Sequence, residues 1–146
     1  MSAGEPLVGI VIASHGSLAR ALLSSAAMIV GAQEGVTAVC LEAQDNLETF
    51  QAALSRAIDQ ADQGAGVVVL LDLFGGTPGN ATLLCMRECE FPAVSGVNLP
   101  MLLEVLLSRR ASSPESLAEL ALESGAKGIV DITARLRAQR QASRSE

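Results

Sequence analysis

The chain has 146 residues, enough for one domain of ordinary size with a buried core. Hydrophobic residues make up 49% of it and aromatic residues only 2%, so the core must consist mainly of Ala, Val, Leu and Ile, which suits helices packed on a parallel sheet. The net charge of −6 argues against broad binding of nucleic acid, and no apolar run approaches the roughly 18 residues that span a membrane.

The first half of the chain is expected to alternate between strands and helices. An apolar strand at about 7–13 precedes a helix that begins near Ser17. No positively charged region precedes this apolar stretch, so we expect a first strand instead of a signal peptide, and the cytoplasm as the location. A second strand is expected at 36–41, and Asp45 with Glu48 would form a capping box for the helix that follows.

A third strand is expected at 67–71, where five apolar residues in a row suit a strand covered on both faces. Asp72 closes this strand, and a Gly-Gly-Thr-Pro turn follows at 75–78. In that turn Thr77 can serve as the N-cap of the third helix, and Pro78 as its first residue.

The last third is expected to hold a short strand, two helices and a final strand. The short strand lies near 93–97, and Pro100 suits the start of the next helix. A further helix is opened by Pro114 and ended by Gly125. The run 128–132 is short and apolar, and it is expected to form the final strand.

One domain is therefore expected at 7–132, followed by a basic tail at 133–146. The tail has a single acid, Glu146, and its basic residues are Arg135, Arg137, Arg140 and Arg144. We interpret the tail as a solubilising helix end, with a contact arm as the alternative. Because a lone edge strand invites association, the strand at 128–132 is expected to pair with a second copy in a homodimer, or else to extend its own sheet.

This alternation predicts an α/β fold with a single open, mostly parallel, doubly wound sheet in the strand order 2-1-3-4, flanked by helices. Such sheets bind ligands beyond the carboxyl ends of their strands, where the strand order reverses. Here that crevice lies between the first and third strands. His15, the only histidine, would line one side of it, and Asp72 the other.

His15 is the candidate nucleophile because its ordinary pKa lies near neutrality. Asp72 is costly to bury alone, but it can accept a hydrogen bond from one imidazole nitrogen and leave the other free to react. A loop histidine and a capping aspartate are the simpler alternatives. The flanking helix starts can hold a phosphoryl group through the following residues: Gly16, Ser17, Gly75, Gly76 and Thr77.

The three cysteines do not indicate a metal site or a disulfide framework. Cys85 and Cys89 are four residues apart and share a helix face, but no second cysteine pair or second histidine completes a ligand set. We interpret them, together with Cys40, as small buried residues. No metal and no organic cofactor is expected.

Three stretches, at 9–16, 71–81 and 96–102, together resemble the signature stretches of the IIA domain of the mannose family, which belongs to the bacterial phosphoenolpyruvate-dependent sugar phosphotransferase system. The resemblance runs from about residue 7 to 110. It implies that His15 accepts a phosphoryl group from the phosphocarrier protein HPr and passes it to a histidine of a IIB partner. It also implies that Asp72 is the hydrogen-bond partner of His15 and that Thr77 lies near the phosphate, and that dimers exchange their final strand.

We therefore predict a cytoplasmic phosphotransferase that acts as a IIA component in sugar uptake, with HPr, IIB and a second copy as partners. No IIB sequence follows within these residues, so a regulator that reports phosphorylation state stays open. One alternative is the phosphotransfer subunit of dihydroxyacetone kinase, which also has a Ser-His pair after its first strand. A small metal chelatase is another, although it generally needs a second metal ligand. The turn at 75–78 and the Asn-Leu-Pro-Met run at 98–101 fit the mannose family better.

Overall fold

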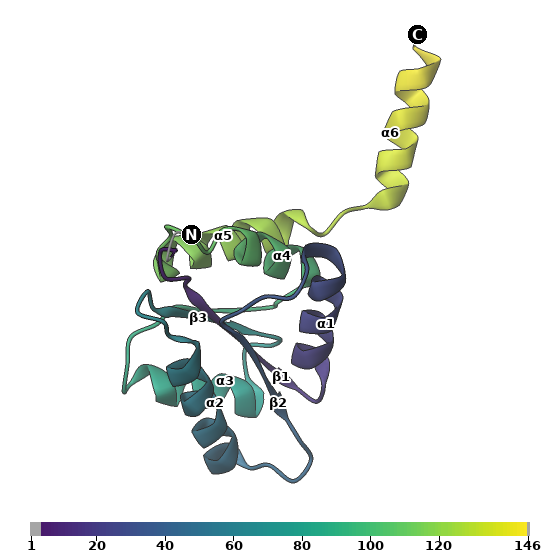
Figure 1. Cartoon of the computed structure of the whole chain (residues 1–146). Coiled ribbons are helices and arrows are strands. Elements are labelled where there is room, and N and C mark those ends of the chain that lie inside the picture. Colours follow the sequence, from purple (N-terminus) through teal and green to yellow (C-terminus); the bar gives the residue numbers. More distant parts are fainter. Residues whose placement is uncertain (1–3, 146) are drawn as a thin grey trace.

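The computed structural model describes residues 4–145 and contains a four-stranded parallel sheet in the order β2-β1-β3-β4 (Figure 1). The strands are β1 (Gly9–His15), β2 (Val36–Leu41), β3 (Val67–Leu71) and β4 (Ala93–Ser95). The predicted strand order is confirmed. The two central strands, β1 and β3, carry their carboxyl ends to the same edge of the sheet, which is where the candidate site lies.

Five helices cover the two faces of the sheet (Figure 1). One face holds α2 (Leu47–Ala61) and α3 (Gly76–Met86), and the other holds α1 (Leu18–Val30), α4 (Leu99–Leu107) and α5 (Pro114–Lys127). Side chains of β1 alternate between the layers: Ile10 and Ile12 pack with α1, α4 and α5, while Val11 packs with α2 and α3. All three are completely buried, and each such burial stabilises the fold by about 1.5–3 kcal/mol.

The start of α2 uses a different capping box from the predicted one. Asn46 is the N-cap, and its Oδ1 accepts a hydrogen bond of 2.8 Å from the backbone N–H of Thr49. The Thr49 Oγ1 in turn accepts one of 3.0 Å from the N–H of Asn46. The prediction of Asp45 with Glu48 was wrong by one residue, because Asn and Thr satisfy the same two N–H groups.

The third helix also starts earlier than predicted. Gly75 is the N-cap and Gly76 the first helical residue, with φ angles of +126° and +67°. These angles lie in a region that favours glycine, so the two glycines complete the turn before Thr77 is reached. Thr77 therefore lies inside the first turn of α3, and its prediction as the N-cap was wrong.

The region after α4 departs most from the prediction. Gly125 does not end α5, which continues to Lys127; a Cβ at Gly125 would meet the Met101 Cε at 2.7 Å, so this glycine permits close packing of α4 and α5. No strand forms at 128–132 in the single described chain, since Gly128 caps α5 and Ile132 begins another helix. Exchange of this segment between two copies stays a prediction.

That last helix is α6 (Ile132–Arg144), which projects from the body (Figure 1). Asp131 is its N-cap and accepts a hydrogen bond of 3.0 Å from the N–H of Ala134. The basic tail is therefore a regular helix joined to the body by a link at 129–131. Across residues 4–145, no helix combines the length and the hydropathy needed to cross a bilayer.

Candidate functional site

The site lies where β1 and β3 end side by side. His15 is the last residue of β1, and Asp72 directly follows β3. One oxygen of Asp72, Oδ2, lies 3.0 Å from the Nδ1 of His15 and also accepts a 3.0 Å hydrogen bond from the backbone N–H of His15. The structure thus brings together the two residues that the sequence placed on opposite sides of the crevice.

This pairing determines which imidazole nitrogen is free to react. A carboxylate can only accept, so in the neutral imidazole the proton of His15 is placed on Nδ1 and the lone pair on Nε2. The side chain of His15 is 43% exposed and that of Asp72 only 11%. The free nitrogen therefore belongs to a ring that another protein can reach, while its orienting carboxylate is protected.

Gly76 places the start of α3 against that free nitrogen. A Cβ at Gly76 would lie 2.7 Å from Nε2 and 3.1 Å from Cε1 of His15, so only glycine fits beside the ring. The first N–H groups of a helix lack partners within the helix and favour anions. An anion attached to Nε2 would therefore meet the positive end of α3.

The turn after His15 is held by a residue that the sequence analysis missed. Ser14 is completely buried, and its Oγ accepts a 2.7 Å hydrogen bond from the N–H of Ala19 and donates one of 3.2 Å to the carbonyl of Gly16. Ser17 is the N-cap residue by position but makes no side-chain capping bond. A capping side chain usually bonds the N–H two or three residues further along the chain, whereas Ser14 bonds the N–H five residues further along. The spacing in the sequence therefore did not indicate this role for Ser14.

The five candidate phosphate-binding residues lie at two helix starts on the same edge of the sheet. Gly16 and Ser17 precede α1, while the other three candidates open α3. Gly16 has a φ of +56° and open space where a side chain would stand, so backbone is accessible there. The N–H of Gly16 donates a 2.9 Å hydrogen bond to the carbonyl of Leu41, so the start of α3 is the side that can receive a tetrahedral anion on His15 with free N–H groups.

The second oxygen of Asp72 is unusual. Its Oδ1 is buried and has no hydrogen-bond partner within residues 4–145. Leaving a buried charged acceptor unpaired costs about 1–3 kcal/mol or more. The negative charge of the Asp72 carboxylate lies beside the imidazole, so it would be stabilised by a positive charge on that ring.

Exposed apolar side chains lie next to the site. Leu73 and Phe74 follow Asp72 and are 56% and 75% exposed, and Leu83 and Met86 of α3 are also exposed. Phe74, Leu83 and Met86 line a cavity of about 170 Å³ between α3 and β4. Clustered apolar side chains on a surface are typical of protein-binding sites.

Cys40 lies on β2 opposite Ser14, next to the register position of His15, whereas Cys85 and Cys89 lie at the far end of α3 and just beyond it. Cys85 is buried, as predicted, and burial together with Cys89 raises the pKa of its thiol to about 11, so it stays protonated near neutrality. Cys89 is exposed and Cys40 half-buried, so the prediction that all three are buried was wrong; Cys89 follows the end of α3 and lies outside its packed face. Within residues 4–145, no three His, Cys, Asp or Glu side chains cluster as metal ligands.

Comparisons with known proteins agree with this geometry. Residues 9–122 match the model of the EIIA-man family, described as PTS system fructose IIA component. The PTS system mannose-specific EIIAB component of Escherichia coli (strain K12) is 35% identical over 130 residues, which cover 88% of this chain but 40% of that protein. The PTS system fructose-specific EIIA component of Bacillus subtilis (strain 168) is 35% identical over 104 residues, which cover 70% of this chain and 71% of that protein.

A solved structure is similar over nearly its whole length. The crystal structure of phosphotransferase system component EIIA from Streptococcus agalactiae aligns with a TM-score of 0.81 and 32% sequence identity, covering 88% of this chain and 99% of that one. A second, the PTS IIA protein associated with the fucose utilization operon from Streptococcus pneumoniae, aligns with a TM-score of 0.80 and 27% identity, covering 91% and 98% of the two chains.

Proposed function

The chain belongs to the EIIA-man family, the mannose-family IIA components of the sugar phosphotransferase system, and on this premise we propose that it carries a phosphoryl group on His15 between two other proteins. Phospho-HPr is the donor and a IIB component the acceptor, in the cytoplasm, where the transfer serves sugar uptake or reports phosphorylation state. The observation that carries the proposal is the imidazole oriented by Asp72 with its Nε2 against the start of α3.

The transfer step follows from this arrangement. Nε2 of His15 attacks the phosphorus atom of the donor, and the bond between phosphorus and the donor atom breaks, with its electron pair returning to the donor. The proton on Nδ1 stays in place, so the ring becomes cationic and is stabilised by the carboxylate of Asp72. Transfer to the acceptor reverses these changes, and most of the rate enhancement comes from positioning and electrostatics.

The transferred group is held by the helix starts. Its oxygens accept hydrogen bonds from backbone N–H groups near Gly75 and Gly76 at the start of α3, and the hydroxyls of Thr77 on that helix and of Ser17 before α1 lie at the same edge of the sheet. Each helix end contributes about 0.3–1 kcal/mol toward an anion when exposed and up to about 2 kcal/mol when partly buried. No metal or organic cofactor is needed for this step.

Two surfaces of the chain would bind other proteins: one binds the donor and the acceptor, and the other binds a second copy of the chain. The exposed Leu73 and Phe74 lie beside the nucleophile and suit the docking of both donor and acceptor. The link at 129–131 includes Ile129, which is 80% exposed. In a homodimer, the link of one chain would pair with the edge strand β4 of the other chain and be covered by it.

Labelling of the single histidine tests the proposal. Incubation with phosphoenolpyruvate, enzyme I and HPr of the same organism should add one phosphate that is labile in acid and stable in base. His15→Ala should abolish the label, because no other histidine can replace His15. Labelling that survives this substitution, or wild-type protein that takes no label, would overturn the proposed function.

A further inference from the structure

Helix α6 has no partner within the described chain. All residues at 129–145 are exposed, including Ile132 at 78% and Leu136 at 44%. An isolated helix of 13 residues is only marginally stable in water, and most helices in proteins depend on packing of an apolar face. We therefore expect α6 to be stabilised by packing these apolar side chains against another surface.

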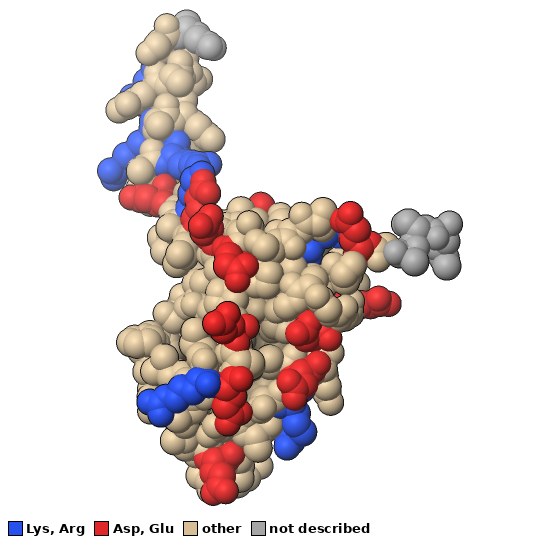
Figure 2. All heavy atoms as spheres, turned by 90° about the vertical axis from the view of Figure 1, so that its left-hand side faces the viewer, with Lys and Arg blue, Asp and Glu red and all other residues tan. Residues whose placement is uncertain are grey.

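The charge of α6 is opposite to that of the body. Four of the 10 basic residues of the chain lie in α6, whereas none of the 16 acidic residues does. Figure 2 shows the basic side chains on the projecting helix and acidic side chains spread over the face of the body below it. A surface that receives α6 should accordingly be acidic at its rim.

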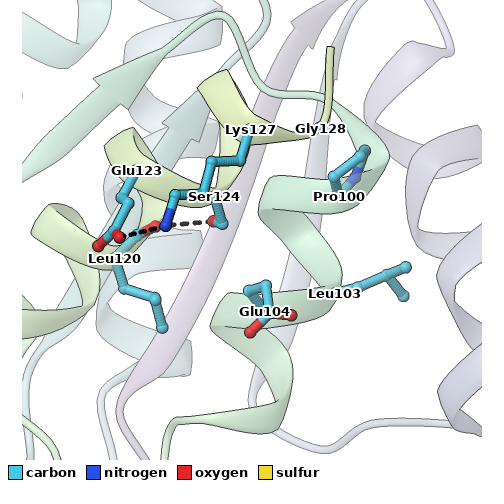
Figure 3. A pocket seen from close by; sticks show the side chains of 8 residues that line it. All are labelled: Pro100, Leu103, Glu104, Leu120, Glu123, Ser124, Lys127 and Gly128. Carbon is cyan, nitrogen blue, oxygen red and sulfur yellow. Dashed lines mark hydrogen bonds and ion pairs between the residues drawn. The ribbon is translucent and has the colours of Figure 1, made fainter. Parts of the chain in front are cut away.

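A groove between α4 and α5 has the complementary features (Figure 3). Its volume is about 510 Å³, and Pro100, Leu103 and Leu120 give it an apolar floor. Glu104 on α4 and Glu123 on α5 stand at its two sides. Only Glu123 has an ion-pair partner within residues 4–145, at 2.7 Å from the Nζ of Lys127. The groove is therefore apolar inside, with one glutamate at each side and with Lys127, which also lines it, paired to Glu123.

The side-chain spacing of α6 matches this groove. Ile132 and Leu136 are four residues apart and form one apolar row, which can lie on the floor of the groove. On a helix with 3.6 residues per turn, Arg135 flanks this row on one side. Arg137, Arg140 and Arg144 flank it on the other side.

The acidic side chains of α5 have a comparable spacing. Glu115, Glu119 and Glu123 recur every four residues, so they share one face of the helix over about 12 Å. Three arginines of α6 extend over a similar length of about 10 Å. With the apolar row in the groove, these arginines would face the glutamates of α5, and Arg135 would face Glu104.

We propose that α6 of one copy lies in the α4–α5 groove of a second copy, so that each chain completes the surface of the other. In the structure α6 points away from its own groove (Figure 1). If the link at 129–131 pairs with the edge strand of a second copy, α6 emerges beside that copy's α5, which contacts β3 and β4. The inference rests on the homodimer of the proposed function and is independent of phosphoryl transfer.

Cross-linking between two differently labelled copies tests this contact. In a Cys89→Ser background, a copy with Leu136→Cys is mixed with a copy with Leu120→Cys under mild oxidation. A disulfide-linked species of twice the chain mass is expected. The matched control pairs Leu136→Cys with Met28→Cys, which is 88% exposed on α1, and should give no such species.

The outcomes separate the inference from its premises. A dimer that forms without this cross-link overturns the placement of α6. A single chain that carries both Leu136→Cys and Leu120→Cys provides a second readout: a disulfide that forms only within one chain also overturns this placement. A full-length chain that sediments as a monomer overturns both this placement and the dimer. Labelling of His15, measured on the same proteins, reports on phosphoryl transfer separately.

Charge reversal provides a second measurement. The triple variant Arg137→Glu, Arg140→Glu and Arg144→Glu should raise the Kd of the dimer roughly tenfold or more, because three exposed ion pairs are lost. The control is Gln139→Glu with Gln141→Glu, which adds acid to α6 and keeps all arginines. An unchanged Kd in the triple variant would contradict the proposed contact.

Discussion

At the scale of single residues, three residues determine the geometry around His15. Asp72 determines which nitrogen carries the proton, Gly76 makes room for the other nitrogen, and Ser14 holds the backbone that follows His15. The first two could be suspected from the sequence, because they follow a buried strand in a glycine-rich turn. The third could not, since its partner Ala19 lies at an uncommon spacing.

Substitution of Gly76 tests the approach of α3 to the nucleophile. Gly76→Ala should lower the rate of His15 phosphorylation on the order of a hundredfold, since the new methyl group would displace Nε2. The control is Gly31→Ala, which also has a positive φ but open space around it. Equal phosphorylation rates in the two variants, measured by rapid quench, would show that the contact with Nε2 is unimportant.

Removal of the Asp72 charge tests its role as the orienting carboxylate. Asp72→Asn should slow transfer in both directions roughly 10- to 100-fold, because the amide can accept a hydrogen bond but cannot stabilise a cationic ring. Asp59→Asn, on the exposed face of α2, is the control and should leave the rate unchanged. Wild-type rates in Asp72→Asn would reduce this residue to a capping role at the end of β3.

At the scale of elements, patterns of apolar residues predicted the strands better than the helix ends. The continuous run in β3 and the alternating layers of β1 follow from burial on both faces, which requires apolar residues throughout. The first residue of a helix depends on which of several neighbouring polar side chains accepts hydrogen bonds from the free N–H groups. At α2 this was Asn46, one residue after the predicted Asp45.

The start of α1 offers a direct comparison of two serines. Ser14→Ala should lower the free energy of unfolding by about 1–2 kcal/mol, because the buried N–H of Ala19 loses its acceptor. Ser17→Ala, at the N-cap position without a capping bond, should change it by less than about 0.5 kcal/mol. Urea unfolding of both variants measures the difference, and the reverse order of effects would contradict the assignment.

At the scale of the whole molecule, the sequence predicted the sheet and the candidate site but not the end of the chain. The strand order follows from apolar runs joined by helices, which leave few arrangements for a parallel sheet. The run at 128–132 is apolar enough for a strand, but a strand needs a hydrogen-bonded neighbour, and the single chain provides none there. The apolar pattern of this run therefore did not distinguish a strand from the end of one helix and the start of the next.

Truncation tests the assembly. A chain that ends at Gly128 should be monomeric by light scattering, because it lacks the apolar link and α6. A chain that ends at Asp131 keeps the link and should form a dimer weaker than that of the full chain. If the shorter chain remains as dimeric and stable as the full-length protein, exchange of the link is wrong.

The exposure of the His15 ring has a consequence for the order of events in a catalytic cycle. The ring is less than half exposed, and it offers a single reactive nitrogen on one face of the molecule. In the proposed function, donor and acceptor both approach that nitrogen, so they compete for the same position and cannot be bound there together. Turnover should then follow ping-pong kinetics, with free phosphorylated chain as an obligatory intermediate and with inhibition when either partner is in large excess.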